Sequence, residues 1–257
     1  MSPDLRRGVL GVVIFVGVAE AVGRTGAIDP KVLPLASAIL DRAAGLATDP
    51  GFLADVGSTL LGWALGLLLT VLVAVPLGLL LGSVPLAETA ARPFIEFLRP
   101  IPSVAIIPLA ILLLPESRDM QLAIIVYGAS WPILINTVYG LREVDPLAKD
   151  TLRSFGFGRL SVLLRVSLPS TAPFIATGIR LSAGIALILA ISAELMGGGT
   201  AGIGTFVIRA GSSIDGVEMI VAATLWAGMI GLLFNLGFGG VERRLFRWHS
   251  SVRSEAS

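Results

Sequence analysis

Long apolar runs separated by shorter polar stretches are the main pattern along the chain. A bilayer-spanning helix needs about 20 mostly apolar residues, and six runs are candidates for such helices. They cover residues 8–23, 59–83, 101–115, 120–141, 171–196 and 219–240. The third is short and contains Pro102, Pro108 and Pro115, which favours a tilted or partly re-entrant helix. The pattern predicts an all-α, polytopic membrane protein with about six transmembrane helices, formed as one domain by residues 1–257.

The first apolar run allows two interpretations. A basic start, an apolar centre and a small-x-small ending make residues 1–21 resemble a secretory signal. We expect a retained span instead, because an even number of spans places both termini on the same side, which agrees with the distribution of the basic residues. The sequence alone leaves the signal interpretation open.

Composition narrows the possible functions. Hydrophobic residues make up 54% of the chain and charged residues only 14%, whereas soluble domains carry about 25% charged residues. The formal net charge of +1 gives no indication of nucleic-acid binding. With no cysteine and with His249 as the one histidine, the sequence predicts no metal site and no cysteine nucleophile. Neither Lys31 nor Lys149 completes a GxxxxGKS or GxxxxGKT phosphate loop, so any ATP must be bound by a separate chain.

The basic residues predict the orientation of the spans. Lysine and arginine concentrate in cytoplasmic loops of membrane proteins, and all but five of the 19 basic residues fall on one side of the predicted spans. The other side holds Arg24, Lys31, Arg42, Arg118 and Arg209. Both termini and the charged loop after the fourth span are therefore expected in the cytoplasm.

That charged loop, about residues 142–169, is longer than a connection between two spans requires. Its first part has helical periodicity, with an apolar stripe made of Leu147, Ala148, Thr151, Leu152 and Phe155. The opposite face carries Lys149, Asp150, Arg153 and Ser154. Asp145 is placed to cap this helix, and Gly156 and Gly158 are placed to end it. A second amphipathic piece leads to Pro169, and by itself the pattern fits a helix on the membrane surface.

The order of these features resembles the EAA loop of ABC importer permeases. In that family the loop forms coupling helices that seat in a cleft of the ATP-binding subunit. Aligned on the glycine, the resemblance assigns ATPase coupling to Asp150, Thr151, Leu152, Arg153, Phe155, Gly156, Leu168 and Pro169. The loop departs from the family pattern where Asp replaces Glu, which shortens the reach of the carboxylate, and where two larger residues replace two alanines.

Two further segments resemble the branch of this family that imports sulfonates, taurine, nitrate and related compounds. They are RPIPSVAIIPLAILLLP at residues 99–115 and FIATGIRLSAGIALILAISAELMGGGTAGIGTFV at residues 174–207. The first segment reads LLP where the branch usually reads WFG. With the charged loop, the resemblance covers roughly residues 55–245.

The resemblance implies a function and a set of partners. The chain would be the transmembrane permease subunit of an ABC importer in a bacterial inner membrane, carrying a small anionic solute such as sulfonate, taurine or nitrate. The implied partners are two copies of an ATP-binding subunit that holds ATP and Mg, a second permease copy, a periplasmic or lipid-anchored substrate-binding protein, and membrane lipid. No nucleic acid, no cofactor in this chain and no enzymatic activity are expected.

Polar residues within the predicted spans are candidates for the substrate pathway. They are Glu194, Asn136, Asn235 and Arg180. A charge within a span is costly and is usually buried in protein or facing water. Each candidate also has an alternative interpretation. Glu194 can be a carboxylate at the membrane interface, and Arg180 can extend its side chain to lipid phosphates. Asn136 and Asn235 can form hydrogen bonds between helices.

Glycines at helical spacing indicate where helices could approach closely. They are Gly57, Gly62 and Gly66 in the second predicted span and Gly178 and Gly184 in the fifth. The alternative is the ordinary enrichment of glycine in membrane helices.

An ion-coupled secondary carrier or channel acting without an ATPase is the alternative function. Such proteins commonly show an internal repeat and several membrane-buried ionisable residues. The sequence shows no repeat and hardly any charge within its spans. A membrane-embedded enzyme would need a cluster of His, Cys, Asp or Glu within the spans, and the sequence has none.

Overall fold

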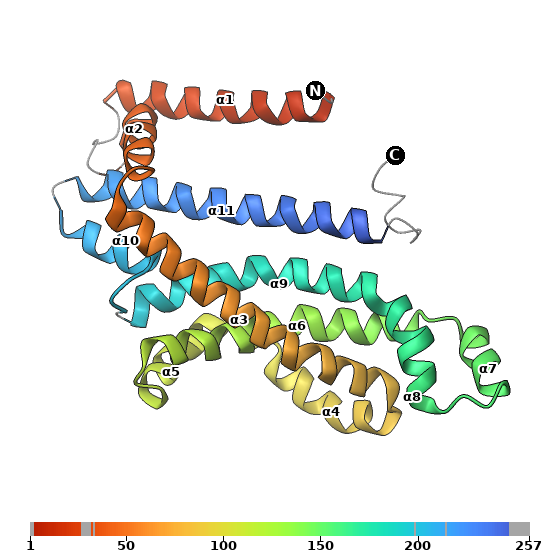
Figure 1. Ribbon diagram of the computed structural model, residues 1–257. Helices are drawn as coiled ribbons and strands as arrows, with labels where there is room; N and C mark the ends of the chain where they lie inside the picture. Colours follow the sequence, from red (N-terminus) through yellow and green to blue (C-terminus); the bar gives the residue numbers. More distant parts are fainter. Residues whose placement is uncertain (1–2, 27–31, 33, 198, 214, 247–257) are drawn as a thin grey trace. The chain divides into compact units, whose positions relative to one another are not determined.

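A computed structural model describes residues 3–26, 32, 34–197, 199–213 and 215–246. Within these ranges all regular elements are helices (Figure 1), which confirms the all-α prediction. The long helices are α1 (Pro3–Arg24), α3 (Pro50–Ser83), α6 (Ser117–Arg142), α9 (Leu168–Gly197) and α11 (Gly216–Leu245). The short elements are α2 (Ala36–Leu46), α4 (Pro85–Leu98), η1 (Ser103–Ile106), α5 (Ile107–Leu113), α7 (Pro146–Ser154), α8 (Arg159–Val162), the π-helical turn η2 (Leu163–Ser167) and α10 (Ile203–Gly211).

Four helices in the described part of the chain are long and apolar enough to cross a membrane. They are α3, α6, α9 with the turns that lead into it, and α11. These match the second, fourth, fifth and sixth predicted spans, although α3 begins at Pro50 rather than at residue 59. Helix α1 coincides with the first predicted span but is not one of the four. The predicted number of six is therefore approximate.

The third predicted span is not a single membrane-crossing helix. The turn η1 has four residues and α5 has seven, which together reach only about 18 Å. Pro115 holds Leu114 in an extended conformation (φ −125°, ψ 92°), and this ends α5. The segment follows α4 at a bend of 81°, so the pair forms either a broken span or a re-entrant loop. The prolines favoured such a shape, whereas α4 itself was not predicted.

The contacts divide the chain into two units, which we describe separately. Unit 1 comprises residues 1–58 and 200–230, and unit 2 comprises residues 59–199 and 231–257. Whether residues 1–257 behave as one domain stays a prediction.

Unit 1 is organised around aromatic packing. The Phe52 side chain is 1% exposed, and its ring lies edge-on to Phe206 and Trp226 with centroid distances of 4.9 and 5.9 Å. The indole Nε1 of Trp226 donates to the Ala43 carbonyl oxygen at 2.9 Å. These contacts join α2, α3, α10 and α11 within the unit. The sequence analysis predicted neither α2 nor α10, because it searched for spans, and these helices of 11 and nine residues are too short to be spans.

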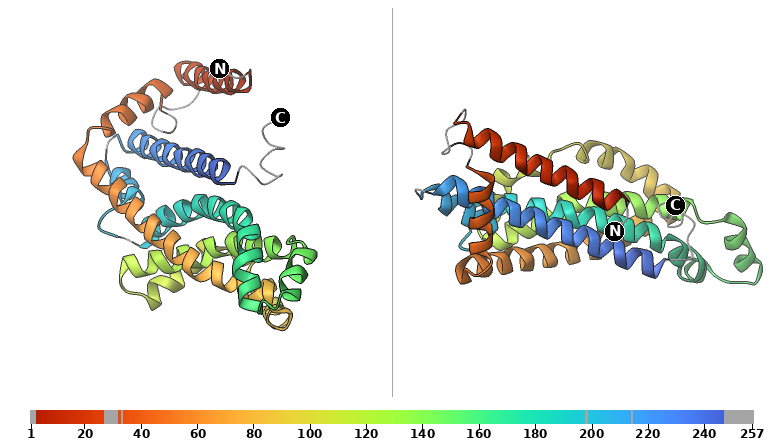
Figure 2. Two further views of the ribbon diagram at one scale, coloured as in Figure 1. Left: turned by 45° about the vertical axis from the view of Figure 1, so that its right-hand side comes forward. Right: turned by 90° about the horizontal axis from the view of Figure 1, so that it is seen from above.

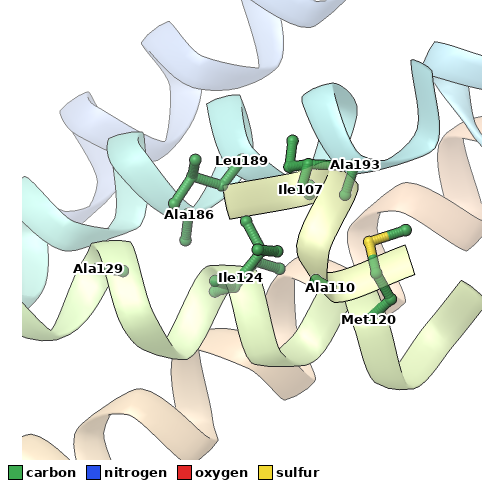
Figure 3. Close-up of a cluster of buried hydrophobic side chains, with 10 residues drawn as sticks. Ile107, Ala110, Met120, Ile124, Ala129, Ala186, Leu189 and Ala193 are labelled. Carbon is green, nitrogen blue, oxygen red and sulfur yellow. The ribbon is translucent and has the colours of Figure 1, made fainter. Parts of the chain in front are cut away.

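The core of unit 2 is the packing of α6 against α9, which lie side by side (Figure 1). The Ser182 hydroxyl of α9 donates to the Ala129 carbonyl oxygen of α6 at 2.6 Å. Figure 3 shows the apolar cluster at this contact, where Ile107 of α5 joins Ile124 of α6 and Leu189 of α9. Small side chains at this contact let the two helices approach closely. In lipid the hydrophobic effect does not drive helices together, so they associate through close packing of this kind.

Three of the five glycines predicted for close helix approach lie at such contacts. A β-carbon at Gly178 would lie 2.9 Å from the Cα atom of Ile133, so the α6 backbone itself would have to move. A β-carbon at Gly62 or Gly66 would meet side chains of α6. Nothing lies within 4 Å of the equivalent position at Gly57 and Gly184.

We therefore expect Gly178→Ala to lower the free energy of unfolding by about 1–3 kcal/mol, because it forces two backbones apart. Gly184→Ala is the matched control on the same helix, where the added methyl group has room. It should be neutral or stabilise the helix by up to about 1 kcal/mol. Unfolding in mixed detergent micelles, followed by tryptophan fluorescence, measures both. Equal stability of the two variants would contradict the close approach at Gly178.

Candidate functional site

The charged loop contains a helix, α7, whose start is fixed by the predicted cap. The Asp145 carboxylate accepts a hydrogen bond from the Leu147 backbone N–H at 2.8 Å, and Pro146 occupies the first helical position. Proline suits that position because its missing N–H would have no partner there. The prediction that Asp145 caps this helix is confirmed.

The end of α7 is a Schellman motif built on Gly156. The Gly156 N–H donates to the Arg153 carbonyl oxygen at 2.9 Å, and the Phe157 N–H donates to the Leu152 carbonyl oxygen at 3.2 Å. Gly156 has φ +83°, a left-handed conformation that glycine adopts without a β-carbon penalty. Gly158 has φ −69° and does not contribute a left-handed residue. Of the two predicted glycines, only Gly156 ends the helix.

The two faces of α7 are exposed to different degrees. Leu147 and Phe155 are 72% and 78% exposed, whereas Ala148, Lys149 and Leu152 are half-buried. The Lys149 ammonium donates to the Leu141 carbonyl oxygen at 3.1 Å, where the C-terminal dipole of α6 favours a cation. The apolar stripe is therefore divided, with part of it packed inward and part presented outward. Lys149 does not lie on the outer polar face as the sequence predicted.

The remaining residues assigned to coupling lie along the same loop. Asp150 and Arg153 are both exposed and pair with each other at 3.0 Å. The Thr151 hydroxyl donates to the Leu147 carbonyl oxygen at 2.8 Å. Figure 2 shows that α7 and α8 lie beyond the ends of α6 and α9.

The second amphipathic piece is continuous with α9 rather than a separate helix. It consists of α8 and the π-helical turn η2, in which the Leu168 N–H donates to the Leu163 carbonyl oxygen. Pro169 has no N–H to donate to the carbonyl of Arg165, so the α-helical hydrogen-bond pattern cannot continue unbroken at this point. Leu168 and Pro169, the closing pair of the predicted loop, therefore form the first turn of α9.

Glu194 lies in a buried polar cluster of unit 2. The residue is 6% exposed, and its carboxylate accepts hydrogen bonds from the Thr59 hydroxyl and the Gln121 amide, both at 2.9 Å. Arg118 in turn donates to the Gln121 amide oxygen at 2.8 Å. The cluster joins α3, α6 and α9, which supports a helix-linking role for Glu194.

The other three pathway candidates lie in different surroundings. Arg180 pairs with Glu242 of α11 at 3.2 Å. Asn136 donates within its own helix to the Pro132 carbonyl oxygen at 2.8 Å. Asn235 lies on an exposed face of α11. The structure therefore does not bring the four candidates together into one site.

Sequence reasoning missed the partners that hold these charges. Glu242 lies in α11 just beyond the sixth predicted span, and Thr59 and Gln121 lie at or next to the ends of predicted spans. Charge spacing within α11 gave no signal for the pairing of Glu242, because Arg243 and Arg244, one and two positions away, do not face it on a helix. No group of three or more metal-ligating side chains is found among the described residues.

These features define a class of protein. The chain is a multi-pass α-helical membrane protein with a capped helix held beyond its spans, and its spans carry paired polar groups.

The chain belongs to the family of binding-protein-dependent transport system inner membrane components, whose model matches residues 74–248. It is 34% identical to a putative ABC transporter permease of Methanocaldococcus jannaschii, over 73% of this chain and 70% of that protein. It is 31% identical to a nitrate import permease of Leptolyngbya laminosa, over 78% and 71% of the two chains. It is 28% identical to a taurine transport system permease of Escherichia coli, over 88% and 83%. The resemblance noted from the sequence is confirmed.

A solved structure has a similar fold. A chain of a bacterial alginate ABC transporter, crystallised in complex with its pentasaccharide-bound periplasmic protein, superposes with a TM-score of 0.66. The identity is 16%, and the match covers 94% of this chain and 96% of that one. At this identity the likeness bears on the fold alone.

The different roles of the two glycines of the loop can be tested. Gly156→Ala places a β-carbon in a left-handed conformation, which costs about 1–2 kcal/mol, so amide hydrogen exchange in α7 should accelerate by about 5- to 30-fold. Gly158→Ala is the control, because its φ is ordinary and nothing lies within 4 Å of the added atom. It should leave exchange in α7 unchanged. Acceleration by both variants, or by neither, would mean that Gly156 does not end the helix as described.

Proposed function

We propose that this chain is the membrane-spanning permease of an ABC importer and that α7 is the helix through which a separate ATP-binding subunit acts on it. Family membership supports the first part, and the exposure of α7 supports the second. The observation that carries the proposal is that Leu147 and Phe155 are 72% and 78% exposed on a helix fixed at both ends. Large exposed apolar side chains on a rigid helix are suited to filling a cleft in a partner.

The connections of α7 supply a route for coupling. Lys149 holds it to the end of α6. After the turn at Gly156, α8 and η2 run into α9 without a break in the helix. A force applied to α7 therefore acts on two packed spans at once. ATP binding and hydrolysis in the partner would bias the permease between inward-facing and outward-facing states, and the permease itself would carry out no covalent chemistry.

A small anion is the proposed substrate class. Relatives of this chain are named as permeases for nitrate, taurine and bicarbonate. Arg180 and Glu242 neutralise each other, so neither group offers a fixed charge that would bind a transported anion strongly. This pairing supports a pathway that releases its anion. We propose that a substrate-binding protein selects the anion and delivers it to the outer mouth, with two permease copies enclosing the path. The chain has the properties of a transport subunit, and a solitary carrier is not favoured.

Replacing Phe155 tests the docking of the ATP-binding subunit. Phe155→Asp should weaken its association with the permease at least tenfold, because a charge replaces an apolar anchor. Phe155→Leu keeps the apolar surface and serves as the matched control. Co-purification of the tagged chain with its ATPase, and ATPase activity stimulated by the permease, are the measurements. Retention of the ATPase by Phe155→Asp, with the permease still folded, would rule out α7 as the docking helix.

Uptake assays test the substrate class in the same variants. A strain lacking the chain should lose uptake of one of nitrate, bicarbonate or taurine and recover it with the wild-type chain or Phe155→Leu. Uptake that persists in the Phe155→Asp strain after ATPase association is lost would favour the solitary carrier instead.

Cysteine labelling tests the proposed orientation, with both termini and α7 in the cytoplasm. The chain has no cysteine, so single substitutions give an unambiguous signal. Ser154→Cys at the end of α7 should react with a membrane-impermeant maleimide only in inside-out vesicles. Ser212→Cys, in the stretch of chain that connects α9 to α11, should react only in right-side-out vesicles. The reverse pattern, or labelling of both from one side, would contradict the orientation.

A further inference from the structure

A cavity of about 550 Å³ lies where α7 and α8 meet the turn between α3 and α4. Two walls that are far apart in sequence form it, residues 82–85 on one side and residues of the 149–167 segment on the other. All of these residues belong to unit 2. The volume falls within the range of small-molecule sites, which is about 300–1,000 Å³.

The charged residues that line this cavity are all cationic. They are Lys149, Arg153 and Arg159, and no acidic residue is among the lining residues. Arg153 shares its charge with Asp150, and Lys149 donates to a backbone carbonyl. Arg159 makes no ion pair within the described part of the chain. At least one full positive charge in the cavity therefore lacks a protein counter-charge.

Neutral donors on the same walls also favour an anion. Ser83 and Ser167 line the cavity, and Ser167 is 5% exposed. Val84 and Pro85 form the start of the 14-residue helix α4, which has no side-chain cap. The positive end of the helix dipole therefore borders the cavity and adds to the field of the three cations.

We propose that this cavity binds a phosphate-bearing anion. Arginine and lysine in a recess with hydroxyl donors match a group that has several charged oxygens. The cavity lies at the end of α6, beside Leu141, where a membrane-crossing helix leaves the hydrocarbon. Basic pockets at this depth suit lipid headgroups, and a free phosphate ion offers the same chemistry. A lipid headgroup and a free phosphate ion would occupy the same site, and the experiment below distinguishes between them.

Binding at this site has a mechanical consequence. The anion would contact the α3–α4 turn and the α7–α8 segment at the same time, and so tie the loop to a third span besides α6 and α9. Arg153 lines the cavity and is also assigned to coupling, whereas Arg159 lines the cavity alone, so substitutions of Arg159 test this site separately from the proposed docking of an ATPase.

The test uses the full-length chain, with whatever subunits co-purify, in nanodiscs of phosphatidylcholine with or without phosphatidylglycerol. Native mass spectrometry measures the phosphatidylglycerol retained after detergent extraction. Thermal stabilisation by sodium phosphate, in phosphatidylcholine alone and at constant ionic strength, measures the free anion. Removing one basic charge near the membrane surface costs about fivefold in affinity, so Arg159→Gln should weaken binding by that factor and Arg159→Glu by more.

Arg165→Gln is the matched control. Arg165 is in the same segment, does not line the cavity, and lies over the Phe157 ring at 4.9 Å. It should leave binding unchanged, and Arg159→Lys should restore most of it. Retention of phosphatidylglycerol that depends on Arg159 identifies a lipid as the ligand, and stabilisation by phosphate that depends on Arg159 identifies a free anion. Absence of both effects, or equal effects in wild type and Arg159→Glu, would overturn the proposal.

Discussion

The close contact between α6 and α9 is the constraint on which the proposed coupling depends. At Gly178 the backbone of α9 approaches the Ile133 Cα atom so closely that a single methyl group has no room. The Ser182 hydroxyl adds a hydrogen bond across the same contact. Because the charged loop connects these two helices, their packing fixes the distance between its two ends. A loop anchored in this way transmits displacement, whereas a loop on mobile supports would absorb it.

Two charged groups inside unit 2 have partners within the protein. Hydrocarbon offers no hydrogen bonds, so each polar group needs a partner within the protein. Glu194 receives two hydrogen bonds from neighbouring helices, and Arg180 pairs with Glu242. These contacts link spans that apolar packing alone would leave free to slide. Glu194 and Arg180 thus join neighbouring helices, and their assignment to a substrate pathway stays a prediction.

Sequence reasoning predicted those features that depend on local chemistry. Long apolar runs identified four spans, and the cap at Asp145 and the left-handed residue at Gly156 followed from rules that need only a few neighbouring residues. It failed where distant segments decide the outcome. Lys149 was assigned to the polar face of its helix, but the free carbonyl of Leu141 draws it inward. Likewise, the spacing of Gly178 and Gly184 is equally suggestive, and only the position of α6 distinguishes them.

The π-helical turn before α9 sets the angular relation between the loop and the span. Such a turn holds one residue more than an α-helical turn, and each residue of an α-helix accounts for about 100° of rotation. Everything on the α8 side of Leu163–Ser167 is therefore rotated by roughly that angle relative to a continuous α-helix. The face that α8 presents is thus set independently of the face that α9 buries against α6. In a chain built this way, the direction of the α8 end can change by single-residue steps while the packing of the span stays as it was.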